Sequence, residues 1–112
     1  MKPSESDYPS IALYISTDPS GAKTLHITGE VELSTCSTFR SSLVSCIAGL
    51  NTQLTIDLTH VEFMDSSGLH ALMEATRTIR KQGGSVCLRN PSHVVHRLLE
   101  ISGLLGCFQI TD

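Results

Sequence analysis

The pattern of apolar and polar residues predicts that the chain begins with a β-hairpin. Residues 11–15 are mostly apolar, and residues 24–28 alternate polar and apolar as a strand with one buried face does. Between them, residues 18–21 read Asp-Pro-Ser-Gly, the residue order of a type I turn. We therefore expect two antiparallel strands joined by this turn.

The rest of the chain alternates helical and extended patterns. Apolar residues at helical spacing predict three helices, each of which stops at glycine: Gly49, Gly83 with Gly84, and Gly103. Short apolar or β-branched runs predict the remaining strands, at residues 54–58, 85–88 and 107–110. The predicted order is β-β-α-β-α-β-α-β. Strands separated by helices require crossover connections, so we expect an α/β fold with a mixed, largely parallel sheet.

Length and composition indicate one soluble domain. The chain has 112 residues, a hydrophobic fraction of 40% and a net charge of −3. We expect a flexible tail at residues 1–9 and a single domain at residues 10–112. The eight Lys and Arg residues form no basic stripe, which argues against direct nucleic-acid binding. No apolar run approaches the length of a membrane span, and no signal peptide is evident, so we expect a cytoplasmic protein.

Cysteine and histidine residues give no sign of a metal site or a cofactor. The four cysteines are widely spaced and without a CxxC pattern, which predicts reduced, buried thiols: Cys36, Cys46, Cys87 and Cys107. His93 and His96 are three residues apart on a predicted helix and could share a face, but no third ligand lies nearby in sequence. We interpret them as part of a solvated helix face.

The segment with the strongest chemical signal is residues 63–69, Phe-Met-Asp-Ser-Ser-Gly-Leu, where a predicted strand meets a predicted helix. A hydroxyl at this position lies near unpaired backbone N–H groups and the positive end of the helix dipole. Both would stabilise a phosphate group attached to it. A simpler explanation is that Ser66 or Ser67 only caps the helix, with Asp65 sharing that task. Spacing alone leaves both explanations open.

Residues 61–69 closely resemble the phosphorylation segment of STAS-domain anti-sigma-factor antagonists. Three further segments resemble this family in the same order along the chain: Gly-Glu-Val-Glu at 29–32, Lys-Gln-Gly-Gly at 81–84 and Ile-Ser-Gly-Leu at 101–104. The resemblance spans roughly residues 11–110. It implies that the α/β domain is a single STAS domain.

The resemblance also implies a function in bacterial transcription regulation. In this family the first serine after the Asp is phosphorylated, and that position is Ser66. The kinase is an anti-sigma factor with serine kinase activity, and a PP2C-type phosphatase reverses the modification. The unphosphorylated antagonist binds the anti-sigma factor and frees the sigma factor, whereas phosphorylation blocks binding. Such partner switching controls stress responses and sporulation, and the antagonist itself is not an enzyme.

The remaining site residues follow from the same resemblance. Asp65, Ser67 and Gly68 are expected to shape the acceptor loop, and Glu30 and Glu32 to line the adjacent docking surface. Glu32 stands where the family usually has Asp, which changes the geometry of this edge by one methylene. His70 likewise stands where a small residue is common. The alternative function is a structural or scaffolding STAS module of a larger complex, with little or no phosphorylation switching.

Three other classes of protein fit the sequence less well. A serine hydrolase would need a nucleophile motif such as GxSxG, and a P-loop protein would need GxxxxGK[ST]; both motifs are absent. Asp57 near the end of a predicted central strand is typical of the phospho-acceptor of a receiver domain. That fold also requires an acidic pair early in the chain and a late Lys, yet no Lys follows Arg89.

Overall fold

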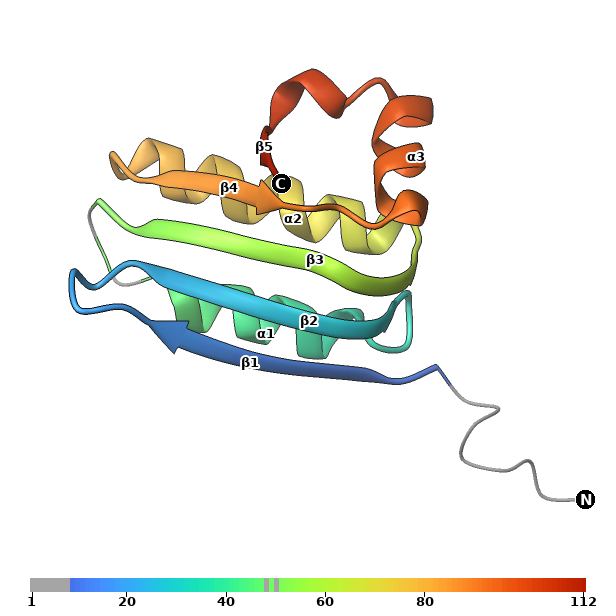
Figure 1. Cartoon of the computed structure of the whole chain (residues 1–112), viewed down its shortest axis with the longest axis horizontal. Helices are drawn as coiled ribbons and strands as arrows, with labels where there is room; N and C mark the ends of the chain where they lie inside the picture. The colour runs from blue at the N-terminus through green and yellow to red at the C-terminus, as the bar shows by residue number, and fades with distance from the viewer. Residues whose placement is uncertain (1–8, 48, 50) are drawn as a thin grey trace, which may run out of the picture.

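The chain folds around a five-stranded mixed sheet with strand order β1-β2-β3-β4-β5 (Figure 1). The computed structural model describes residues 9–47, 49 and 51–112, so residues 1–8 of the predicted tail lie outside the described part. The strands are β1 (Ile11–Thr17), β2 (Lys23–Val31), β3 (Gln53–Met64), β4 (Ser85–Arg89) and β5 (Gln109–Thr111). β1 pairs antiparallel with β2, and the other neighbours pair in parallel. The predicted α/β fold and element order are confirmed.

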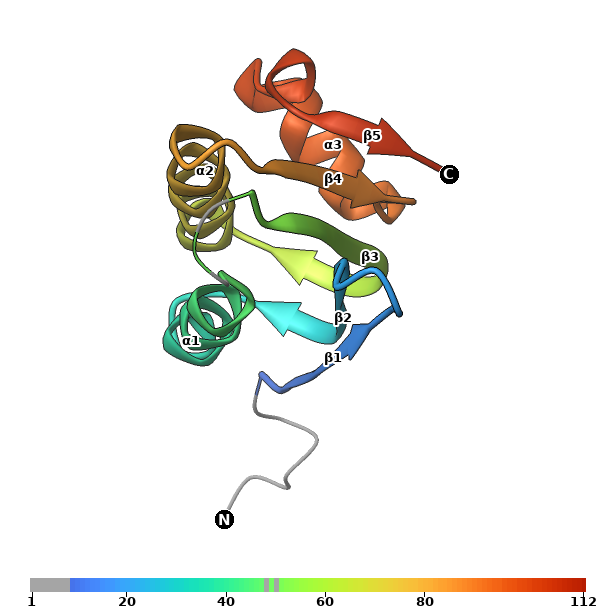
Figure 2. The same ribbon diagram turned by 90° about the vertical axis from the view of Figure 1, so that its left-hand side faces the viewer.

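Two helices cover the same face of the sheet. Helix α1 (Cys36–Cys46) connects β2 to β3, and helix α2 (Ser66–Lys81) connects β3 to β4. Both connections step in the same direction along the sheet, so right-handed crossovers place both helices on one side, as Figure 2 shows. Among the described residues, no helix covers the opposite face of β1 and β2. The core between sheet and helices includes fully buried side chains from every layer: Leu25, Ile27, Phe39, Ile56, Leu72, Ile79 and Leu88.

Helix α1 departs from its predicted apolar side. Val44 shares helical spacing with the apolar residues Phe39 and Leu43, which are buried, yet its own side chain is 67% exposed. Cys36 and Cys46 take buried positions instead. The sequence predicts that this helix stops at Gly49, whereas the structure ends it at Cys46; residues 48 and 50 lie outside the described part. The buried residues of α1, at positions 36, 39, 43 and 46, recur at intervals of three and four and form one helix face, and Val44 lies outside that face.

The C-terminal part also differs in detail from the prediction. Helix α3 (His93–Ser102) lies beside the second half of β3, beyond the end of β4 (Figure 1). A short 3-10 helix, η2 (Leu105–Cys107), follows it, so that β5 begins at Gln109 rather than at the predicted residue 107.

All four cysteines are free thiols, but Cys87 is only half-buried and Cys107 is exposed. The prediction of burial therefore holds only for Cys36 and Cys46.

Candidate functional site

The two segments with the strongest sequence signals meet at the carboxyl ends of β2 and β3. Glu30 lies opposite Phe63 and Val31 opposite Met64 in the parallel register. Just beyond the strands, the backbone N–H of Asp65 donates to the carbonyl of Val31, at 3.0 Å. The turn that leads into α1 therefore lies directly beside the turn that leads into α2.

Gly29 explains how the first segment reaches this position. Its φ of +109° favours glycine, and a Cβ at this residue would lie only 2.4 Å from the carbonyl oxygen of Ser10. The next residue, Glu30, donates its N–H to that same oxygen at 2.8 Å. The residue just before β1 thus lies directly against β2 at Gly29, the point where the register of β2 with β3 shifts.

Asp65 organises the start of α2. It is the N-cap residue, and its Oδ1 accepts hydrogen bonds from the backbone N–H of Ser67 at 2.9 Å and of Gly68 at 3.4 Å. The same oxygen accepts the Ser67 hydroxyl. Two of the N–H groups that the first helical turn leaves unpaired are therefore satisfied by one carboxylate. The structure assigns the cap to Asp65 rather than to either serine.

Electrostatics keep the Asp65 carboxylate ionised. Desolvation by burial acts to raise its pKa, but the hydrogen bonds from the Ser67 side chain and from the backbone of Gly68, Ser67 and Leu33 together outweigh that effect and lower it. A negative charge at this position also complements the N-terminus of α2. The acceptor loop thus already contains one fixed negative charge.

The two adjacent serines occupy different environments. Ser66 is exposed at the first residue of α2, and its hydroxyl has no hydrogen-bond partner among the described residues. Ser67 is half-buried, its hydroxyl donates to Asp65, and its carbonyl oxygen accepts the thiol of Cys36 at 3.4 Å. Of the two hydroxyls, only that of Ser66 is both accessible and uncommitted.

Gly68 is buried beneath this turn rather than presented on the surface. A Cβ at this position would lie 2.7 Å from Cγ1 of Val31 and 2.8 Å from Cγ of Met64. The missing side chain lets α2 approach the ends of β2 and β3 closely. Gly68 therefore shapes the loop from inside.

The two glutamates are half-buried; Glu30 lies near the end of β2, and Glu32 lies in the turn that follows it. The Glu32 carboxylate accepts the backbone N–H of Ser34 at 2.8 Å as well as the Ser34 hydroxyl, so it holds the turn before α1. Thr35 donates its hydroxyl to the carbonyl of Glu30 at 2.7 Å. Thr35 is the N-cap residue of α1, but its side chain binds this turn and makes no capping bond to the helix.

Two exposed apolar side chains near this turn were not recognised from the sequence. Leu33 is 79% exposed and Phe63 is 48% exposed, although both are large and hydrophobic. Phe63 lies next to Glu30 in the sheet register, and the backbone of Leu33 contacts the Asp65 carboxylate. The signal in the sequence was the position of Leu33 between polar residues immediately before a helix start.

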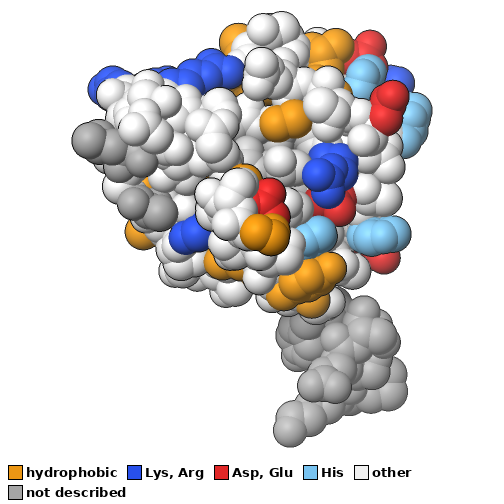
Figure 3. All heavy atoms as spheres, turned by 60° about the vertical axis from the view of Figure 1, so that its left-hand side comes forward, with side chains coloured by type: hydrophobic (Ala, Val, Ile, Leu, Met, Phe, Trp, Pro, Cys, Tyr) orange, Lys and Arg blue, Asp and Glu red, His pale blue; other side chains and the backbone are white. Residues whose placement is uncertain are grey.

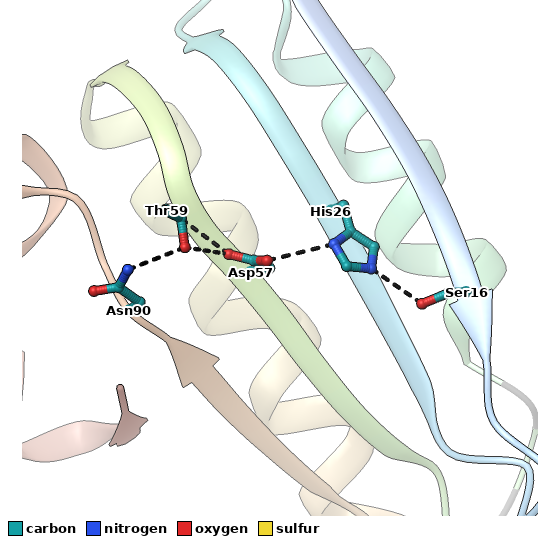
Figure 4. A network of polar contacts seen from close by, with 5 residues as sticks. All are labelled: Ser16, His26, Asp57, Thr59 and Asn90. Carbon is teal, nitrogen blue, oxygen red and sulfur yellow. Dashed lines mark hydrogen bonds and ion pairs between the residues drawn. The ribbon is translucent and has the colours of Figure 1, made fainter.

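A second polar constellation crosses the open face of the sheet (Figure 4). The Ser16 hydroxyl lies 3.0 Å from Nε2 of His26, and Nδ1 of His26 lies 3.4 Å from the Asp57 carboxylate. Asp57 also accepts the backbone N–H and the hydroxyl of Thr59. The rings of Tyr14 and His26 stack, with centroids 4.2 Å apart. Although hydrolases use this order of hydroxyl, imidazole and carboxylate, here the side chains lie across an open sheet surface and tie three strands together.

Neither a metal site nor a receiver-type phospho-acceptor finds support in the described part of the chain. Among residues 9–47, 49 and 51–112, no group of three His, Cys, Asp or Glu side chains is arranged to hold a metal ion. His96 pairs with Glu100 at 2.8 Å. The Asp57 carboxylate already bonds Thr59 and pairs with His26. Asp57 also lies within β3, whereas a receiver phospho-acceptor lies at the end of its strand. No described helix has both the length and the apolar character of a membrane span.

Comparisons with known proteins agree with this architecture. Residues 15–112 match the STAS domain. The anti-sigma-B factor antagonist of Bacillus subtilis (strain 168) is 34% identical over 87 residues, which cover 78% of this chain and 79% of that protein. An anti-sigma factor antagonist from Mycobacterium paratuberculosis has a similar crystal structure, with a TM-score of 0.80, 24% identity and coverage of 92% and 86% of the two chains.

The fold is also that of the Bacillus cell fate determinant SpoIIAA. Its unphosphorylated form gives a TM-score of 0.74 at 22% identity, covering 90% of this chain and 89% of that one. Its phosphorylated form gives a TM-score of 0.71. The sequence match over residues 15–112 shows that the chain belongs to the STAS-domain family, and curated relatives that it matches are named anti-sigma factor antagonists.

Proposed function

We propose that this protein is a cytoplasmic anti-sigma factor antagonist that is switched by phosphorylation of Ser66. In the unphosphorylated form it binds an anti-sigma factor that is also a serine kinase, and thereby releases the sigma factor. The kinase transfers the γ-phosphoryl group of ATP to the Ser66 oxygen, and a PP2C-type phosphatase removes it by hydrolysis. The protein acts as a binding partner and not as an enzyme. SpoIIAA, which shares the fold, has been determined in unphosphorylated and phosphorylated forms.

The contrast between Ser66 and Ser67 carries this proposal. A kinase must reach the acceptor oxygen and remove its proton, which favours an exposed hydroxyl without a competing partner. Ser66 meets this requirement, whereas the Ser67 hydroxyl is bound to Asp65. Asp65 already accepts the N–H groups of Ser67 and Gly68, so the positive end of the helix dipole would provide the main local stabilisation of the phosphate once it is attached.

The surroundings of Ser66 have the composition of a docking surface. Leu33 and Phe63 supply exposed apolar area that can be buried against a partner, and Glu30 and Glu32 supply an acidic margin. Partly apolar patches with a polar rim are typical of protein interfaces. We expect Gly68 to contribute indirectly, because it sets the backbone beneath Ser66 without contacting the partner.

Phosphate would block this surface by its charge and bulk. It adds about −1.5 to −2 charges near neutral pH, next to the ionised Asp65. Since the helix N-terminus can stabilise the phosphate locally, the fold has no need to rearrange. Ser66→Asp adds only one charge and less bulk, so it should weaken binding less than phosphorylation does. Raising the salt concentration should recover part of the lost affinity, because exposed charges are screened over about 8–10 Å at physiological ionic strength.

The acceptor is tested by incubating the full chain with its cognate anti-sigma factor and magnesium ATP, followed by intact-mass analysis. We expect the mass of one phosphoryl group on the unmodified protein and on Ser67→Ala, and none on Ser66→Ala. Full labelling of Ser66→Ala would contradict the assignment. Stable partner binding by a protein that no kinase modifies would instead support the scaffolding function.

A further inference from the structure

A cavity of about 650 Å³ lies at the other end of α2, far from Ser66. One wall is the C-terminal half of α2, and the other is the segment from η2 into β5. Arg80 joins the two walls, since its Nη2 donates to the carbonyl of Cys107 at 3.1 Å. Small-molecule sites in proteins typically have volumes of about 300–1,000 Å³, so this cavity is large enough for a ligand.

The cavity combines an apolar interior with a cationic margin. Met73 and Phe108 contribute the apolar surface, and Arg77, Arg80 and Lys81 contribute three positive charges. No carboxylate of the described residues lines it, although the chain as a whole carries a net charge of −3. Figure 3 shows Lys and Arg side chains gathered along the edge of the molecule over this end of α2. Three of the eight Lys and Arg residues are thus concentrated around one hollow.

Stabilisation of the helix dipole does not account for this arrangement. Arg80 and Lys81 already place positive charge in the last turn of α2, where it complements the dipole. Arg77 lies one turn earlier, three residues from Arg80 and four from Lys81, so the three like charges share a helix face and repel one another. Within the described residues, none of the three forms an ion pair.

The wall of the cavity also contains an unsatisfied polar group. Thr76 lines the cavity and is only 4% exposed, and its hydroxyl oxygen has no hydrogen-bond partner among the described residues. Buried hydroxyl groups almost always have a partner, so an orphaned one needs an explanation. The oxygen itself is buried, so it could bond an occupant of the cavity only after rotation about the first side-chain torsion of Thr76.

The geometry points to a binding site for a small anionic amphiphile, a carboxylate or phosphate head group on an apolar tail. The head group would lie among Arg77, Arg80 and Lys81, where cationic donors form strong, charge-assisted hydrogen bonds. The tail would lie against Met73 and Phe108, where burial of apolar surface favours binding. The site is separate from the proposed switch, because Ser66 and Arg80 are about 20 Å apart along the helix at 1.5 Å per residue.

The test is an NMR titration of the isotope-labelled full chain with octanoate, octyl phosphate and, as the neutral control, 1-octanol. We expect saturable shifts in the amides of residues 76–81 and 106–109 with at least one anion. The anion that binds more tightly identifies the head group as carboxylate or phosphate. 1-Octanol should bind at least about tenfold more weakly, because it lacks the charge-assisted hydrogen bonds.

Matched arginine variants test the cationic margin. Arg77→Gln removes one charge and leaves the Arg80 bond to Cys107 intact, so we expect about tenfold weaker binding of the anion. Arg89→Gln makes the same chemical change on β4, outside the cavity, and should leave binding within about twofold. Equal affinity for octanol and the anions, equal loss in the two variants, shifts centred elsewhere or no saturable shifts would each overturn the inference.

Discussion

Replacing Asp65 separates the two roles of its carboxylate at the start of α2. Asp65→Ala removes both the acceptor of the Ser67 and Gly68 N–H groups and the negative charge. An N-cap residue contributes about 1 kcal/mol and a charge at the helix N-terminus about 0.3–1 kcal/mol. Because the second cap bond is long, at 3.4 Å, we expect a loss of about 1–2 kcal/mol in the free energy of unfolding. Asp65→Asn keeps an acceptor oxygen and should lose only the charge contribution.

Thermal melting at neutral pH measures both variants. For a domain of this size, 1 kcal/mol corresponds to about 4–6 °C in melting temperature. We therefore expect Asp65→Ala to melt about 4–12 °C below the unmodified protein and Asp65→Asn to fall between them. Equal losses in the two variants would refute the division into cap and charge, and no loss in Asp65→Ala would refute the cap itself.

The pH dependence gives an independent check of the charge contribution. The pKa of Asp65 is lowered in the folded protein from the ordinary value of 3.8. Its contribution to stability is therefore fully present well above pH 3.8 and is lost as the pH falls through the lower, folded-state pKa. The difference in unfolding free energy between the unmodified protein and Asp65→Asn should accordingly shrink as the pH falls below about 4. A difference that grows on acidification would show that the sign of this reasoning is wrong.

Three further predictions follow from packing and charge elsewhere. Gly68→Val should lower the melting temperature as well as the affinity for the anti-sigma factor, because even the Cβ of the valine would overlap Val31 and Met64. Overpacking costs about 1–3 kcal/mol, so an unchanged melting curve would contradict this prediction. Thr76→Val should raise the unfolding free energy by about 1 kcal/mol, since it removes a buried, unpaired hydroxyl; destabilisation in urea unfolding would reveal a missed partner. Desolvation acts to raise the pKa of Asp57, but hydrogen bonds from Thr59 and the charge of His26 outweigh it and lower the pKa. Asp57→Asn should therefore lose less stability than the unmodified protein as the pH falls below about 4. Equal losses of stability in the two proteins on acidification would exclude that contribution.

The order of elements could be predicted from the sequence because local signals mark each boundary. Gly83 and Gly103 both have positive φ at the helix ends where the sequence placed them. The type I turn also forms as predicted, with Gly21 donating to the carbonyl of Asp18 at 2.9 Å. These features depend on residues close together in the chain, and therefore appear in a single sequence.

Features that depend on distant residues could not be predicted in the same way. The resemblance implied only that Gly68 shapes the acceptor loop; it could not show that this helix residue packs against Val31 of β2. Likewise, the hydrophobic spacing in α1 could not show that Val44 faces away from the sheet. The choice between Ser66 and Ser67 rested on family resemblance, and only the three-dimensional contact of Ser67 with Asp65 supplied a physical reason for it.

Calorimetric titration of the anti-sigma factor with the unmodified protein, the Ser66-phosphorylated protein and Ser66→Ala tests the central claim most directly. The proposed switch predicts tight binding by the unmodified protein and by Ser66→Ala, and at least about a hundredfold weaker binding after phosphorylation, equivalent to about 2.7 kcal/mol. Amide NMR spectra of the two forms should then differ only around residues 30–35 and 63–70. Equal affinity of the phosphorylated and unmodified proteins for the anti-sigma factor would contradict the account.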